Sequence, residues 1–61
     1  MNSKEIIKKL KAAGFALVSI SGSHHKFCHP DGRMTIVKHP RKDTPLGTLK
    51  AMERQAGMKL K

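Results

Sequence analysis

The chain has 61 residues, with 13 lysine or arginine residues against four aspartate or glutamate residues and a formal net charge of +9. This length predicts one small domain, 1–61, which buries only ~60% of the surface that its unfolded form exposes. A single cysteine, Cys28, excludes an internal disulfide. No apolar run is long enough to predict a membrane-spanning segment, and although a membrane surface would also suit the charge, no membrane partner is predicted. We therefore expect a cytoplasmic protein with an anionic partner, nucleic acid first and an acidic protein second.

The first predicted element is a helix over about residues 3–13. Asn2 or Ser3 is its N-cap, and Glu5 stands where a capping box has its acidic residue. Apolar residues then recur with the spacing of one helix face. They are Ile6, Ile7, Leu10 and Ala13. Gly14 suits the position after the helix because glycine takes a positive φ without strain. The lysines of this helix are expected to form a solvated face.

Three strands are expected next. Phe15–Ser21 is rich in strand-forming residues, and we expect its better apolar face to turn inward. The chain then turns at Gly22-Ser23 and returns along His24–His29. Pro30-Asp31-Gly32-Arg33 is a strong turn signal before a third strand over Met34–Lys38. This order predicts a three-stranded antiparallel meander.

A second helix is predicted after the strands. Thr44 is its expected N-cap and Pro45 its first helical residue. The expected apolar stripe consists of Leu46, Leu49, Met52 and Ala56. Gly57 ends the pattern, and the tail from Met58 is expected to fray. The complete order, α-β-β-β-α, predicts an α+β fold in which two helices cover one face of the sheet and the other face is open.

The histidines are the most informative side chains, since three of the four fall within one eight-residue stretch. Histidine exchanges protons near neutral pH, so a histidine beside a turn of a basic chain favours acid–base chemistry on a phosphodiester. If Phe27 faces the core, strand alternation puts His25 on its side and His24 and Lys26 on the open face. This makes His24 the candidate base. The alternative is that these histidines are simply polar positions of a hairpin.

Other chemistries fit the sequence less well. His24 and His25 point to opposite faces of a strand and no carboxylate cluster accompanies them, so we expect no metal or other cofactor. Cys28 lacks a protease or CxxC pattern and is expected to be a packed residue. RNA supplies its own nucleophile, the 2′-hydroxyl, so one histidine with nearby cations suffices to cleave it. The candidates for RNA contact are Gly22, Ser23, Lys26, Lys38, Arg41 and Lys42.

Several motifs of the chain occur together in one known family. They are Ala13-Gly14-Phe15-Ala16-Leu17-Val18, Gly22-Ser23-His24-His25, Pro30, Thr35-Ile36-Val37 with His39-Pro40, and Gly47-Thr48-Leu49 with Gln55-Ala56-Gly57. In these, nearly the whole chain resembles the HicA toxins of type II toxin–antitoxin systems. The resemblance implies a double-stranded-RNA-binding-domain-like fold, a ribosome-independent mRNA interferase with His24 as its catalytic histidine, and a HicB-type antitoxin that blocks the site.

The chain departs from that family at two places, and two other functions stay open. Ser19 and Ser21 stand where many members carry an arginine, and a proline is missing before His39. His25 is expected to support the site rather than to react. The first alternative function is a non-catalytic RNA-binding module of the same fold. The second is an interaction protein whose charge serves only to bind an acidic antitoxin, and any homo-oligomer is expected only through the antitoxin complex.

Overall fold

The computed structural model describes residues 1–60 as one sheet with two helices. Helix α1 spans Ser3–Ala12, the strands β1, β2 and β3 span Ala16–Ser21, His24–Cys28 and Met34–Lys38, and helix α2 spans Leu46–Ala56. The sheet is antiparallel throughout, in the order β1-β2-β3, so the predicted α-β-β-β-α fold of the double-stranded-RNA-binding type is confirmed. Neither helix of the described residues has the length and apolar composition that crossing a membrane requires.

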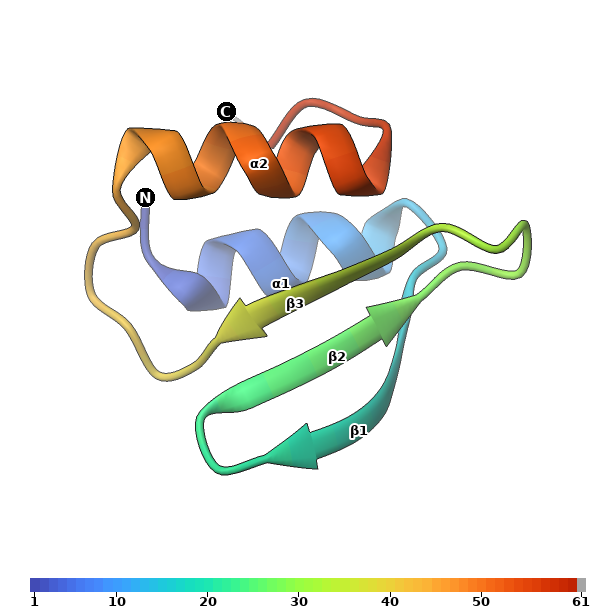
Figure 1. Ribbon diagram of the computed structural model, residues 1–61, viewed down its shortest axis with the longest axis horizontal. Coiled ribbons are helices and arrows are strands. Elements are labelled where there is room, and N and C mark those ends of the chain that lie inside the picture. Colours follow the sequence, from blue (N-terminus) through green and yellow to red (C-terminus); the bar gives the residue numbers. More distant parts are fainter. Residues whose placement is uncertain (61) are drawn as a thin grey trace.

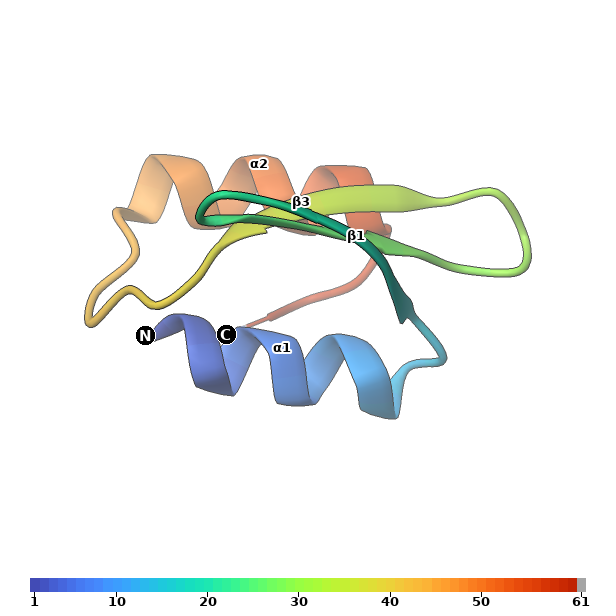
Figure 2. The ribbon, with the colours of Figure 1, turned by 90° about the horizontal axis from the view of Figure 1, so that it is seen from below.

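The helices cover only part of the sheet. Figure 1 shows β1 as the strand farthest from both helices, and Figure 2 shows α1 beneath the sheet while α2 runs beside β3. The buried cluster joins residues of both helices to one face of β2 and β3. It consists of Ile6, Leu10, Phe15, Phe27, Val37, Leu49, Met52, Ala56 and Leu60. The helix residues in this cluster are three or four apart, as the predicted stripes require.

The ends of the two helices differ in how they are capped. Asn2 is the N-cap of α1, and its Oδ1 accepts the N–H of Glu5 at 2.8 Å, which resolves the choice between Asn2 and Ser3. The prediction that Thr44 caps α2 is wrong, because Pro45 is the N-cap and no side chain bonds to this helix end. Thr44 is instead buried, and its N–H donates to the carbonyl oxygen of Met1 at 2.9 Å.

Strand β1 differs most from the prediction. It begins at Ala16, and all six of its residues are exposed, so the expected inward apolar face is not buried. The pairing register shifts after Leu17, which makes Val18 the extra residue of a β-bulge. The bulge brings Leu17 and Ile20 to the same face, but no helix covers them and they stay 41% and 58% exposed. Only Phe15, just before the strand, is buried.

The second helix and the tail also depart from the expected pattern. Leu46 was predicted to belong to the apolar stripe of α2, yet it is 53% exposed in the first turn of the helix. The tail from Met58 was predicted to fray, but Leu60 is fully buried. Its N–H donates to Oε2 of Glu53 at 2.8 Å, so the described tail folds back onto the core. Lys61 lies outside the described residues.

Candidate active site

The turn between β1 and β2 presents the predicted histidine. Gly22 has a φ of 59°, and positive φ values occur only at glycines among the described residues. A glycine with positive φ at the first central position of a two-residue hairpin is typical of a type II′ turn. His24 follows as the first residue of β2, paired with Ser21, and it is exposed. Within residues 1–60 no hydrogen bond engages its ring, so both ring nitrogens are available to a substrate.

The register of β2 and β3 determines which side chains share the open face. His24 pairs with Lys38, and Phe27 pairs with Thr35. Phe27 and Thr35 are each 1% exposed and therefore face the core. Because side chains alternate along a strand, Lys26 and His24 face the other way. The condition on which His24 was preferred to His25, the burial of Phe27, is met.

A groove of about 140 Å³ connects His24 with the start of α2. It is lined by His24, Ile36, Val37, Lys38, Arg41, Thr44, Thr48 and Met52. We refer to it as the His24 groove. Two of the predicted RNA-contacting cations, Lys38 and Arg41, thus lie beside the candidate base, and no carboxylate of residues 1–60 lines this groove. A developing negative charge in this groove would meet two cations and no competing anion.

The other predicted RNA-contacting residues lie outside this groove. Lys26 is half-buried and stands two residues along β2 from His24 on the same open face. Lys42 lines a different groove, which it shares with Arg41 beside the start of α1. Gly22 and Ser23 form the turn itself, where the backbone oxygen of Ser23 is already used by two neighbouring groups.

Two further histidines, His25 and His39, hydrogen-bond to the turn. The Nδ1–H of His25 donates to the oxygen of Ser23 at 3.2 Å, and the His25 ring meets the His39 ring edge-on with 5.1 Å between centroids. The backbone N–H of His39 donates to the same oxygen at 2.8 Å. Nδ1 of His39 lies 2.8 Å from Oγ of Ser3, which is 2% exposed. The sequence predicted no role for His39 in the site, although His39-Pro40 is one of the family motifs and alternation from the buried Val37 puts His39 on the core side.

Arg41 is held firmly at the edge of the His24 groove. Its N–H donates to Oγ of Ser3 at 2.9 Å, and its carbonyl oxygen accepts the N–H of Ser3 at 2.9 Å. The Nε–H of Arg41 donates to the carbonyl oxygen of Asp43 at 3.1 Å. These bonds fix the backbone and the stem of the guanidinium, whose terminal nitrogens remain for a substrate. A cation fixed in advance stabilises charge with little reorganisation.

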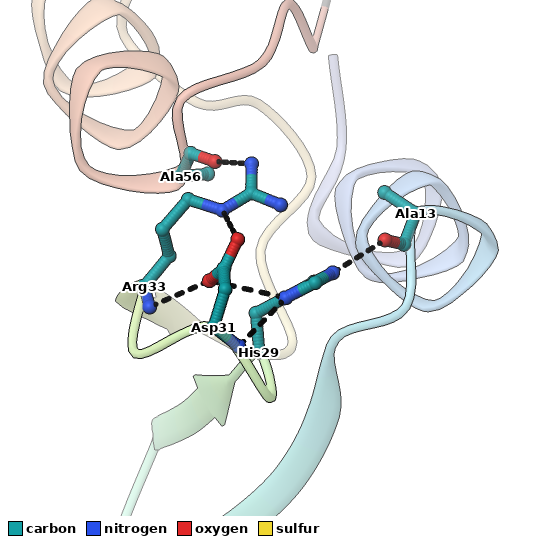
Figure 3. Close-up of polar contacts among 5 residues, drawn as sticks. All are labelled: Ala13, His29, Asp31, Arg33 and Ala56. Atoms are coloured by element: carbon teal, nitrogen blue, oxygen red, sulfur yellow. Dashed lines mark hydrogen bonds and ion pairs between the residues drawn. The ribbon is translucent and has the colours of Figure 1, made fainter.

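A separate polar cluster lies beyond Cys28, at the other end of β2 from His24. Figure 3 shows its contacts. The Nε2–H of His29 donates to the oxygen of Ala13 at 3.1 Å, and Nη1 of Arg33 donates to the oxygen of Ala56 at 2.7 Å. The loop after β2 is thereby tied to the ends of both helices. Asp31 accepts the backbone N–H and the Nε–H of Arg33 at 3.0 and 2.7 Å.

The charge of that cluster is set by its hydrogen bonds. The backbone hydrogen bond from Arg33, followed by its side-chain hydrogen bond and positive charge, lowers the pKa of Asp31 below the ordinary 3.8, although desolvation opposes the shift. These groups bond to one another and to helix ends, so their role is structural.

Cys28, at the end of β2, is a half-buried free thiol. In the part of the chain that the structure describes, no three His, Cys, Asp or Glu side chains are placed to hold a metal ion.

The fold and the groove define a class of protein: a small, strongly basic domain of the double-stranded-RNA-binding type that carries an exposed histidine between cations. The model of the family described as HicA toxin of bacterial toxin-antitoxin matches residues 3–58. The chain therefore belongs to the HicA toxin family, as its motifs predicted. No curated protein matches it. Membership makes it a nuclease-type toxin of a toxin–antitoxin system, a class whose partners are RNA and an antitoxin.

Proposed function

We propose that this toxin is a metal-independent endoribonuclease that cleaves mRNA with His24 as the general base. One observation supports it most: in a member of the HicA family, His24 lies exposed in a groove beside Lys38 and Arg41. RNA brings its own nucleophile, so a base, a pair of cations and a geometry that aligns the attack are sufficient. A single groove on a domain of 61 residues can supply these.

The proposed reaction needs one proton to move twice. His24 accepts the proton of the 2′-hydroxyl while its oxygen attacks the adjacent phosphorus. The bond from phosphorus to the 5′-oxygen of the next nucleotide then breaks, and protonated His24 returns the proton to that oxygen. The products are a 2′,3′-cyclic phosphate and a 5′-hydroxyl. Lys38 and Arg41 stabilise the negative charge on the phosphorane oxygens, where loss of one such donor costs ~10²–10³ in rate.

The same surface suggests how substrate and antitoxin are recognised. Both phenylalanines, Phe15 and Phe27, are buried, so no aromatic platform from these residues is open to bases. Recognition of RNA would rely on backbone charge and would have low sequence specificity. A HicB-type antitoxin would inhibit the toxin by covering the His24 groove, where cations without carboxylates favour an acidic partner. Action on mRNA would take place in the cytoplasm.

The test compares wild type, His24→Ala and Lys50→Ala, since Lys50 is exposed on α2 and lines neither groove. Wild type and Lys50→Ala should stop growth when they are induced in cells. As purified proteins, both should cleave mRNA to products with 2′,3′-cyclic phosphate ends, and they should do so in the presence of metal chelators. Folded His24→Ala should bind RNA but cleave it ~10²–10⁴-fold more slowly. Cleavage that survives this substitution, or that chelators abolish, would refute the proposal. If wild type binds RNA but does not cleave it, the alternative function, a non-catalytic RNA-binding module, would be supported instead.

A further inference from the structure

A second and larger groove adjoins the His24 groove. It has a volume of about 470 Å³ and includes the cations Lys4, Arg41 and Lys42 and the ring residues His39 and Pro40. In the described part of the chain, no carboxylate lines it. We refer to it as the Lys4 groove. Its volume lies within the ~300–1,000 Å³ that is usual for small-molecule sites, whereas the 140 Å³ of the His24 groove lies below that range. The smaller groove suits a phosphodiester and the larger one a whole nucleotide.

Arg41 joins the two grooves because it lines both of them. An RNA strand with its reacting phosphate at His24 and Arg41 must continue past Arg41 on at least one side. The Lys4 groove lies on that side, and it offers two more cations beyond Arg41. The cations of both grooves would then be available to successive phosphates of one strand.

We propose that the Lys4 groove binds the nucleotide next to the cleavage point of the RNA strand. Lys4 and Lys42 hold its far phosphate, and its base lies against Pro40 and the ring of His39. Nδ1 of His39 is engaged by Ser3, so Nε2 is the ring nitrogen left for the base. This inference rests on the proposed function, because it identifies the substrate contacts of the same site.

The ligands are side chains rather than the start of α1. Oδ1 of Asn2 already accepts the N–H of Glu5, and the N–H of Ser3 donates to the oxygen of Arg41. The amides of Ser3 and Glu5 at this helix end are thus engaged within the protein. Cations alone would suit an acidic side chain of a partner protein equally well. The ring surfaces and the volume of the groove favour a nucleotide over such a side chain.

The first test measures binding in the His24→Ala background, so that it does not depend on cleavage. Lys4→Gln/Lys42→Gln is compared with Lys8→Gln/Lys9→Gln, which removes the same charge from exposed positions of α1 outside both grooves. The probe is a short single-stranded RNA of mixed sequence. Loss of one phosphate contact should reduce the slope of log affinity against log salt by ~0.7, and the control pair should change it by less than about half of that.

The second test shortens the RNA by one nucleotide at either end of a minimal substrate. In the active background, Lys4→Gln/Lys42→Gln should raise KM with little change in kcat, because it removes ground-state binding. One of the two truncations should raise KM similarly and abolish the effect of the substitutions. The nucleotide site would be refuted if both lysine pairs changed binding and KM equally, or if Lys4→Gln/Lys42→Gln still raised KM with both truncated substrates. Cleavage by wild type, and with it the proposed function, would not be affected by that result. If wild type does not cleave, the proposed function fails and the binding test alone decides on the site.

Discussion

Ser3→Ala tests whether one buried hydroxyl holds the two grooves in place. Oγ of Ser3 accepts the N–H of Arg41 at 2.9 Å and lies 2.8 Å from Nδ1 of His39, and the residue is 2% exposed. The substitution removes Oγ and leaves the rest of the residue unchanged. Two partners then lose a hydrogen bond in a part-buried place, and each unsatisfied buried group costs ~1–3 kcal/mol. Because both hydrogen bonds are only part-buried, we expect the lower part of the summed range, a fall in the free energy of unfolding of roughly 2–4 kcal/mol.

That loss is large for a chain of this size. At ~0.05–0.15 kcal/mol per residue, 61 residues give a total free energy of unfolding of roughly 3–9 kcal/mol. Urea titration followed by circular dichroism measures the change, in the His24→Ala background so that the protein can be produced. Ser19→Ala is the matched control, because Ser19 is exposed on β1 and should change the free energy of unfolding by less than about 0.5 kcal/mol.

The result also bears on catalysis. With His24 present, Ser3→Ala should lower kcat by more than its unfolded fraction explains, because Arg41 is no longer fixed at the groove. If Ser3→Ala is no less stable than Ser19→Ala, the hydroxyl does not bridge Arg41 and His39. The claim that Arg41 is held in place before the substrate binds would then be withdrawn.

Two further predictions concern the core and the acid stability. Leu60→Ala should lower the free energy of unfolding by ~2–5 kcal/mol, because Leu60 is fully buried. Leu46→Ala, at a 53% exposed position, should lower it by less than about 1 kcal/mol. Similar losses for the two variants in urea titrations would contradict the burial of Leu60. The pKa of Asp31 in the folded state lies below the ordinary 3.8. Between the folded-state and unfolded-state pKa, the unfolded chain therefore binds more protons than the folded one. The stability that Asp31 contributes is lost as the pH falls through this interval. The melting temperature of wild type should therefore fall in acid below about pH 4 and that of Asp31→Asn should fall less, and identical pH profiles of the two proteins would show that Asp31 is not engaged.

The elements of the fold were predictable because their signals are local. The stripe containing Ile6 and Leu10 and the stripe containing Leu49 and Met52 follow the period of a helix, and both helices use them for burial as expected. The third strand has the predicted bounds, Met34–Lys38. Its buried positions alternate with exposed ones, which is the pattern of a strand with one covered face.

The departures arise where distant parts of the chain decide the outcome. The sequence of β1 is apolar enough for either face, but the bulge at Val18 and the distance from both helices leave the strand uncovered. Thr44 has the right type for an N-cap, yet the N-terminal segment pairs with its backbone and the helix begins after Pro45. Leu60 stands alone between two lysines and shows no periodic signal, so its burial in the core and its hydrogen bond to Glu53 are apparent only in the structure.

In the candidate site, too, the features with a local sequence signal could be predicted and those that depend on distant residues could not. His24 could be selected from alternation alone, since the burial of Phe27 decides the face of each neighbour in β2. Lys38 and Arg41 were both predicted as RNA contacts, but the position of Arg41 beside His24 could not be predicted, because Arg41 lies in an irregular segment that lacks any period. What places Arg41 is Ser3, a residue 38 positions away whose hydroxyl accepts the N–H of Arg41. In the proposed mechanism, a buried serine at the start of a helix would therefore affect the chemistry of a histidine that it does not touch, so Ser3→Ala should be measured for both stability and cleavage.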